Sequence, residues 1–290
     1  MLPPPPPDAS GLPSREPRKS RSELLKSVEV PQHQRQPFIL CGYRQTPAGP
    51  CGLLRTIFTL HNETGNMWTH LLGSFYVVGI GVELVGGLDS EAHAELGADA
   101  LWVLALCCTT AACLLASFSY HLCCCTERRV CECMHKMDQT GIISLIIMSY
   151  FSGIALGYRC LPGTRLVYLC FAGCVGVALA LPLAFRRLVS NVPRHLTICC
   201  VAGILPAGHW VCIASSANKQ LALPYLVTMF GCYGSGAWIY FAQWPECRWP
   251  GRFDIVGHSH QLWHLLVLGA AITWVRGNVR LLLDLECDGS

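Results

Sequence analysis

Four ionisable residues stand beside strongly apolar stretches, although they lie far apart in the sequence. His121 follows one apolar run, Asp138 precedes the next, and His260 and His264 open the last one. If the chain crosses a membrane at each run, these run ends share one face of the membrane, whichever way the chain is inserted. Three imidazoles and a carboxylate at one depth are the ligands and the base that a zinc ion and an activated water require.

The spacing within this group favours a shared site. His260 and His264 are four residues apart, so both rings lie on one face of a helix, about one turn apart. Ser117 lies one turn before His121, where its hydroxyl could hold a neighbouring group or a water. Three histidines with an open fourth position are typical of a catalytic zinc, and Asp138 would take a proton from the water. The alternative interpretation is that these residues cap helix ends and touch headgroups and loops.

Membrane-spanning helices are the elements that would position these residues. Of the 290 residues, 52% are hydrophobic and only 13% are charged, whereas a soluble domain carries roughly 25% charged residues. Apolar segments of about 20 residues recur, each long enough to cross a bilayer core of ~30 Å. The predicted fold class is therefore all-α, a bundle of seven transmembrane helices. The predicted spans are Trp68–Leu88, Ala100–Leu122, Gln139–Gly157, Leu166–Phe185, Leu196–Ser215, Leu221–Gln243 and His260–Leu283.

Basic residues are distributed unequally between the two sides of the predicted bundle. With the N-terminus in the cytosol, 16 of the 21 Lys and Arg residues fall on the cytosolic side. The opposite side keeps only Arg159, Arg165, Lys219, Arg276 and Arg280. Because basic loops tend to stay in the cytosol, this bias predicts a cytosolic N-terminus and an extracellular or luminal C-terminus. The histidine group is then cytosolic, and the orientation is opposite to that of G-protein-coupled receptors.

Four regions of the chain differ in composition. Residues 1–45 are polar and proline-rich, and are predicted to form a disordered cytosolic tail. Residues 46–67 include a short amphipathic segment that could lie on the inner membrane surface. Residues 68–285 form the seven-helix domain, and residues 286–290 a short extracellular or luminal tail.

The chain has 19 cysteines. Most fall within spans or in cytosolic segments, where we expect reduced thiols. The cluster from Cys123 to Cys133 could carry palmitate or form a small metal knuckle, but its spacing supports neither, and unmodified thiols are favoured. Cys160 and Cys287 fall on the far face, where a disulfide is conceivable although nothing in the sequence supports it.

A second polar group precedes the first span. Asn66 and His70 are four residues apart and share one helix face, and Glu63 lies one turn before Asn66. This group is predicted to hydrogen-bond loops together at the cytosolic end of the bundle. Asn62 and Thr64 complete an N-glycosylation acceptor pattern, which a cytosolic location predicts to be unmodified.

Three sequence blocks make the chain resemble a known family. Through them it resembles the progestin and adipoQ receptor family, which includes the adiponectin receptors and the haemolysin III relatives. The resemblance covers all but the N-terminal tail. The blocks are FTLHNETGNMWTHLLG at residues 58–73, SFSYHL at 117–122 with MDQTG at 137–141, and PGRFDIVGHSHQLWHL at 250–265.

The resemblance implies a zinc ion bound by His121, His260 and His264, with Asp138 and Ser117 placing a water. Within the family, the chain is similar to the adiponectin-receptor branch and to a Golgi-resident branch that traps Raf kinase, through LPAGHW at 205–210 and GYR at 42–44. Beside the aspartate, Gln139 stands where the family commonly has an aromatic residue. The neighbouring wall of the site is therefore expected to differ.

Two functions follow as expectations. The first is a membrane receptor with a cytosolic-side zinc site that hydrolyses lipid amides such as ceramide, with Asp138 acting as base and then as acid. The second is a non-catalytic Golgi tether that sequesters a signalling kinase such as Raf through its cytosolic face. A transporter is less expected, because matching helix breaks in two halves are not evident.

The expected partners are a membrane lipid and a cytosolic kinase or signalling adaptor. Nucleic acid is not expected, because the net charge of +3 reflects membrane topology. The expected location is the Golgi or plasma membrane, with the chain as a multi-pass protein.

Overall fold

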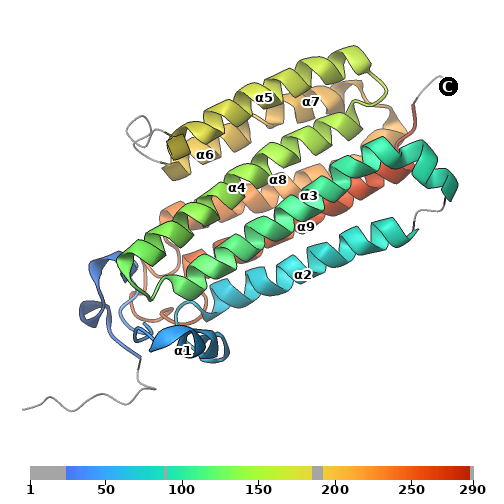
Figure 1. Cartoon of the computed structure of the whole chain (residues 1–290). Helices are drawn as coiled ribbons and strands as arrows, with labels where there is room; N and C mark the ends of the chain where they lie inside the picture. Colours follow the sequence, from blue (N-terminus) through green and yellow to red (C-terminus); the bar gives the residue numbers. More distant parts are fainter. Residues whose placement is uncertain (1–23, 88–89, 185–191, 288–290) are drawn as a thin grey trace, which may run out of the picture.

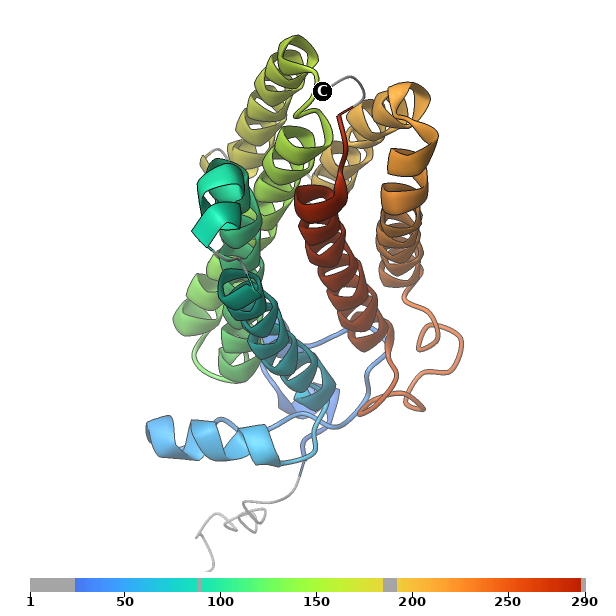
Figure 2. The ribbon, with the colours of Figure 1, turned by 90° about the vertical axis from the view of Figure 1, so that its right-hand side faces the viewer.

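A bundle of antiparallel helices makes up most of the computed structural model, which describes residues 24–87, 90–184 and 192–287. Six long helices run along the bundle, and two short ones together form a seventh rod. A further short helix, α1 (Gly49–Arg55), lies across one end of the bundle (Figure 2). The others are α2 (Thr64–Gly87), α3 (Ser90–Cys123), α4 (Arg128–Gly157), α5 (Pro162–Ala184), α6 (Val192–Val201), α7 (Ile204–Ile213), α8 (Ser216–Ala242) and α9 (Ser259–Asp284).

Within the described residues, six segments are long and apolar enough to cross a membrane. They comprise α2, α4 and α9, most of α3 and α5, and the rod formed by α6 and α7. The remaining rod, α8, contains Pro224 and several Gly, Ser and Tyr residues, which lower its mean hydropathy. It nevertheless packs along α9 inside the bundle (Figure 1). The all-α, seven-helix fold predicted from the sequence is thus confirmed.

The fifth rod is broken between α6 and α7 around Ala202 and Gly203. The Tyr150 hydroxyl of α4 donates a hydrogen bond to the Cys199 carbonyl at 2.6 Å. A Cβ atom at Gly203 would come within 3.1 Å of that hydroxyl. The break lies where the rod approaches α4 closely, one turn before Pro206, which has no N–H to donate to the Ala202 carbonyl. The predicted continuous span misses this local signal.

Two helices begin much earlier than the apolar runs that predict them. α3 begins at Ser90, whereas the predicted span begins at Ala100, and α4 begins at Arg128, well before Gln139. The first turns of α4 are polar and extend beyond the apolar segment. As a result, Asp138 lies inside a helix and does not open one.

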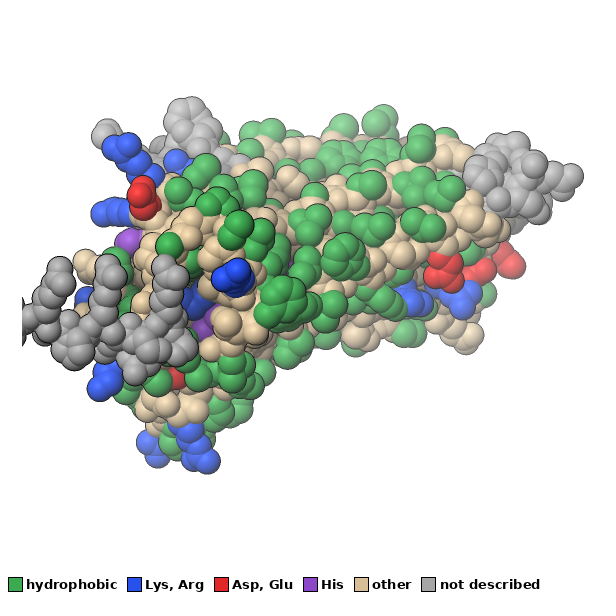
Figure 3. Space-filling model, turned by 60° about the horizontal axis from the view of Figure 1, so that its bottom comes forward, with side chains coloured by type: hydrophobic (Ala, Val, Ile, Leu, Met, Phe, Trp, Pro, Cys, Tyr) green, Lys and Arg blue, Asp and Glu red, His purple; other side chains and the backbone are tan. Residues whose placement is uncertain are grey.

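Hydrophobic side chains line both the interior and the outer surface of the bundle. Val77, Leu106, Leu156 and Leu282 are among those buried in the core. Many large apolar side chains are exposed on the outside, as expected for a surface that faces lipid. In Figure 3 this hydrophobic surface covers the middle of the visible face, and charged side chains gather toward its two ends.

Residues 24–46, here called the N-terminal strap, fold against the end of the bundle next to α1. The strap contains two 3-10 turns, η1 (Ser27–Glu29) and η2 (Gln32–Gln34), and a bridge between Leu25 and Tyr43. Val30, Ile39 and Tyr43 form a small buried apolar cluster. The sequence predicts disorder through residue 45, whereas the described part of that segment is folded; residues 1–23 lie outside the described range.

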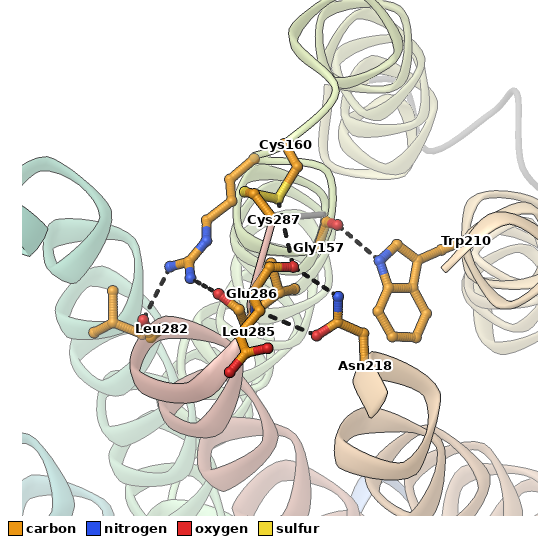
Figure 4. The surroundings of a disulfide bond; sticks show 9 residues. Gly157, Cys160, Trp210, Asn218, Leu282, Leu285, Glu286 and Cys287 are labelled. Atoms are coloured by element: carbon orange, nitrogen blue, oxygen red, sulfur yellow. Dashed lines mark hydrogen bonds between the residues drawn. A yellow bond between two sulfur atoms is a disulfide. The ribbon is translucent and has the colours of Figure 1, made fainter. Parts of the chain in front are cut away.

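The opposite end of the bundle is closed by a disulfide between Cys160 and Cys287 (Figure 4). Arg159 donates a hydrogen bond to the Leu282 carbonyl at 3.0 Å. Asn218, at the start of α8, donates to the Glu286 carbonyl at 2.8 Å. The C-terminal end of the chain is therefore fixed to the α4–α5 connection and to the start of α8, at the end of the molecule opposite the strap (Figure 1).

Candidate metal centre

Three histidines meet at the strap end of the bundle. His121 lies in the last turn of α3, and His260 and His264 lie in the first two turns of α9. One ring nitrogen from each lies within 4.8 Å of one from each of the others, and the rings are largely enclosed. The sequence predicts this grouping from residues that are up to 143 positions apart, and the structure brings them together.

The distance between two of the three donors matches that of two ligands on a tetrahedral metal ion. The Nε2 atoms of His121 and His260 are 3.4 Å apart. Two nitrogen ligands on a tetrahedral zinc, each about 2.0–2.1 Å from the ion, lie about 3.3–3.4 Å from each other. Imidazole nitrogens bind Zn²⁺ as well as Cu, Fe and Ni ions, so this donor set is suited to a transition-metal ion.

A buried carboxylate fixes the tautomer of one ligand. Nδ1 of His121 lies 2.7 Å from Oε2 of Glu63, and both side chains are buried. With Nδ1–H donated to the carboxylate, the Nε2 lone pair is free for a metal. Asn66 donates to the same Glu63 oxygen at 2.6 Å. Glu63 is therefore an outer-shell partner of a candidate metal ligand.

The electrostatics of Glu63 agree with this contact. Burial alone would raise the pKa of Glu63. The charge of the His121 ring when it is protonated, and the hydrogen bonds from His121 and Asn66, outweigh burial and hold the pKa of that carboxyl well below its ordinary value. Glu63 is consequently ionised and able to accept the Nδ1–H of His121.

His70 packs against the other side of the cluster. Its ring stacks on the His264 ring with centroids 3.9 Å apart and planes 17° apart. Both ring nitrogens of His70 are buried and have no hydrogen-bond partner among the described residues. Its contact with the candidate ligand is therefore a packing contact between two flat rings.

Asp138 and Ser117 are brought together by close packing of α3 and α4. A Cβ atom at Gly141 would lie 3.0 Å from the Cα of Cys113, so glycine permits this approach one turn from both residues. Ser117 is buried, and its hydroxyl interacts with the Asp138 carboxyl. Asp138 Oδ1 is buried without a hydrogen-bond partner in the described part of the chain. Ser117 thus contacts the carboxyl group, while Oδ1 has no partner among the described residues.

The α8–α9 loop fixes the start of α9. The Glu246 carboxylate accepts the backbone N–H of Ser259 at 2.7 Å, as well as the Ser259 hydroxyl. Gln261 donates to the Asn62 carbonyl at 3.1 Å, and His258 also contacts this carbonyl, at 3.0 Å. These contacts tie the helix that carries two candidate ligands to the segment before α2.

The sequence alone indicates the polar group near Glu63, but not its role at the metal centre. Asn62, Glu63 and Asn66 do link loops and helices, as predicted. The contact between Glu63 and His121 joins residues 58 positions apart, and no spacing rule could have shown it. A usable signal was present: an acidic residue one turn before a buried polar helix face, at the same end of the bundle as three histidines.

Comparison with known proteins agrees with the fold and with the motif positions. The family model described as Haemolysin-III related matches residues 58–275. The chain is 28% identical over 252 residues to the adiponectin receptor protein of Drosophila melanogaster, a match that covers 83% of this chain and 55% of the fly protein. The chain thus spans about half the length of that relative.

Two further relatives are matched over most of their length. Heptahelical transmembrane protein 1 of Arabidopsis thaliana is 28% identical over 263 residues, covering 87% of this chain and 79% of the plant protein. Progestin and adipoQ receptor family member 3 of Homo sapiens is 28% identical over 257 residues, covering 84% and 80%. The family match begins before α2, continues well into α9 and includes all three histidines. The chain therefore belongs to the haemolysin-III-related family, the family of the progestin and adipoQ receptors.

Proposed function

We propose that the chain is a receptor-type integral membrane protein with a zinc site at the strap end of the bundle, and that this site hydrolyses lipid amides of the ceramide type. The observation that carries the proposal is the combination of three converging imidazoles with a buried carboxylate oxygen that has no partner of its own among the described residues. A purely structural zinc site normally has four protein ligands, whereas three leave a position for a water or a carbonyl.

The residues around the site have separable chemical tasks. Zinc bound by His121, His260 and His264 would supply Lewis acidity, which polarises an amide carbonyl and makes water easier to deprotonate. Asp138 accepts the proton of the attacking water through Oδ1, and then returns it to the nitrogen of the leaving amine. Ser117 holds the carboxyl in place from α3, so that Oδ1 keeps its direction.

The orientation that we propose places this site at the cytosolic face. Two independent features support it. Of the Lys and Arg residues that the structure describes, most belong to segments at the strap end, as expected for a cytosolic side. The disulfide between Cys160 and Cys287 lies at the other end, and disulfides persist in oxidising compartments such as the Golgi lumen or the cell exterior. The Golgi and the plasma membrane are both compatible with this arrangement.

Glycosylation of Asn62 would be a poor test of orientation. Asn62 is buried and contacts the start of α9, so a glycan there is incompatible with the fold in either orientation. Cys133 is exposed near the start of α4, at the strap end. A membrane-impermeant maleimide, with the labelled residue located by peptide mapping, should label Cys133 in sealed Golgi vesicles without permeabilisation, because their cytosolic face is outward, and on intact cells only after permeabilisation. Labelling of Cys133 on intact cells, or its protection in sealed Golgi vesicles until they are permeabilised, would place the site on the opposite side.

The hydrolase proposal is tested with the purified chain in lipid nanodiscs, using a long-chain ceramide as substrate. Release of fatty acid is measured for the native chain and for Asp138→Asn, with zinc content determined in parallel. We expect Asp138→Asn to lose about 100-fold or more in turnover while it retains zinc. Asp99→Asn is a matched control, because Asp99 pairs with Arg165 near the disulfide end. Equal turnover in native chain and Asp138→Asn would exclude the proposed role of this carboxylate.

A second candidate function is a non-catalytic tether that sequesters a cytosolic kinase such as Raf. A specific surface favours it: Phe38, Leu40 and Trp249 are exposed apolar residues on the strap and the α8–α9 loop. The two segments touch, because Gly251 donates its N–H to the Phe38 carbonyl at 3.3 Å. Phe38→Asp should then abolish recruitment of kinase to membranes without changing lipid turnover. Unchanged recruitment would exclude this surface as the docking element.

A further inference from the structure

We propose that the N-terminal strap is part of the metal centre, and that Gln36 is a positioning residue for the ligand His121. The proposal rests on the zinc site of the proposed function. It goes beyond that function by assigning a role in metal binding to a segment whose composition predicts disorder. The argument has three steps: the contact to the ligand, the fixing of the strap, and its anchorage to the other ligand-bearing helix.

The first step is a chain of hydrogen bonds that ends on the ligand. The Gln36 amide donates to Oε1 of Glu63 at 2.5 Å, and the other oxygen of the same carboxylate accepts Nδ1–H of His121. Partners that hold an outer-shell carboxylate fix the direction in which the ligand ring points. Gln36 therefore reaches the ligand through a single intermediate residue.

The second step concerns how Gln36 is held. Its backbone N–H donates to the Tyr43 hydroxyl at 2.9 Å, and Tyr43 is buried. Tyr43 in turn pairs with Leu25 through two backbone hydrogen bonds of 2.7 and 3.1 Å. The strap is thus folded on itself, and this fold presents the Gln36 amide to Glu63.

Arg44 adds a second link between the strap and the same ligand. Its guanidinium donates to the backbone carbonyl of His121 at 2.6 Å and to the Thr56 hydroxyl at 2.8 Å. Carbonyls in the last turn of a helix lack helical partners, so a buried arginine is a favourable donor there. The strap therefore contacts both the backbone of His121 and, through Glu63, its side chain.

The third step ties the strap to the helix that carries the other two ligands. The Asp254 carboxylate accepts the backbone N–H groups of Leu40 and Cys41 at 3.0 and 2.7 Å. Asp254 lies in the loop that leads directly into α9. The strap thus spans the two helices that provide all three histidines, and displacing it would loosen the geometry of the site.

The experiment measures metal binding by the full-length chain in nanodiscs. Zinc affinity is determined by competition with a chromophoric chelator, and Co²⁺ substitution reports ligand geometry through its visible absorption spectrum. The variants are Gln36→Ala and Gln36→Glu, the second of which places a like charge beside Glu63. Gln34→Ala is the matched control, because Gln34 lies on the same strap but donates to the Thr126 carbonyl.

We expect Gln36→Ala to weaken zinc binding by about tenfold and to alter the Co²⁺ spectrum, with a larger loss in Gln36→Glu. Gln34→Ala should bind zinc as the native chain does. Melting of the metal-free proteins shows whether each variant remains folded. Native affinity and spectrum in both Gln36 variants would overturn the proposal, as would an equal loss in Gln34→Ala. A native chain that binds no metal would overturn the proposed zinc site together with this inference, whereas zinc loading without lipid turnover would affect only the hydrolase.

Discussion

Nδ1 of His121 and Oε2 of Glu63 lie 2.7 Å apart, with both side chains enclosed by protein. This contact decides which nitrogen of His121 faces the other two histidines. A carboxylate that accepts Nδ1–H also makes the opposite nitrogen a better electron donor to a metal. The metal centre therefore includes residues of α2, α3, α4 and α9 and of the strap, in addition to the three candidate ligands.

Glu63→Gln tests the contribution of that charge. The amide can still accept a hydrogen bond but carries no negative charge, so we expect zinc affinity to fall by about 10- to 100-fold. Chelator competition measures the change. Glu132→Gln is the control, because Glu132 is exposed and pairs with Arg128 on the surface of α4. Native affinity in Glu63→Gln would contradict the assigned role.

His70 should stabilise the metal centre by packing its ring against His264, and not by hydrogen bonds or metal ligation through its ring nitrogens. His70→Phe keeps a flat ring against His264 and removes two buried nitrogens that have no partner among the described residues. We expect it to bind zinc as the native chain does, at equal or higher thermal stability. His70→Ala leaves a cavity and should destabilise the fold by about 2–4 kcal/mol while weakening zinc binding.

The two His70 variants therefore form a pair with opposite expectations. Thermal unfolding in detergent and chelator competition are measured on both. Loss of zinc in His70→Phe equal to that in His70→Ala would show that a ring nitrogen of His70 is required, which contradicts the packing role.

The disulfide should matter for stability but not for the metal. Cys160 and Cys287 are separated by 127 positions, and closing a loop of this size restricts the unfolded chain. We expect Cys287→Ser to lose about 2–4 kcal/mol of stability, which lowers the melting temperature. Zinc affinity should stay unchanged, because the bond lies at the opposite end of the bundle. Cys212→Ser is the control, since Cys212 is a free, exposed cysteine.

A fall in zinc affinity for Cys287→Ser, at a temperature where the protein remains folded, would show that the two ends are coupled. Treating the native protein with reductant should reproduce the effect of the substitution on melting. No change in melting in either case would mean that the hydrogen bonds of Arg159 and Asn218 suffice to hold the C-terminal segment.

The sequence predicts the helices and the three histidines because both obey local rules. Apolar runs mark the spans, and the four-residue spacing of His260 and His264 marks one helix face. The search for apolar runs misses the first turns of α4, because these turns are polar and extend beyond the apolar segment. Asp138 is consequently placed at a helix opening by the sequence and inside the helix by the structure.

The strap and Glu63 could not be predicted because their partners are distant in sequence. Leu40 and Cys41 depend on Asp254, more than 200 positions away. The prediction of disorder follows the proline-rich residues at the start of the chain and overlooks the apolar residues Val30, Ile39 and Tyr43. In both cases the deciding contact is a tertiary one.

The central claim is that the three histidines bind zinc. It is tested most directly by measuring zinc per purified polypeptide, by mass spectrometry of the metal, in the native chain, His260→Ala and His209→Ala. His209 contacts Tyr168 and lies outside the cluster, so its variant controls for the loss of any histidine. We predict about one zinc per chain in the native protein and in His209→Ala, and little or none in His260→Ala. Folded native protein without zinc, or an unchanged zinc content in His260→Ala, would contradict the account.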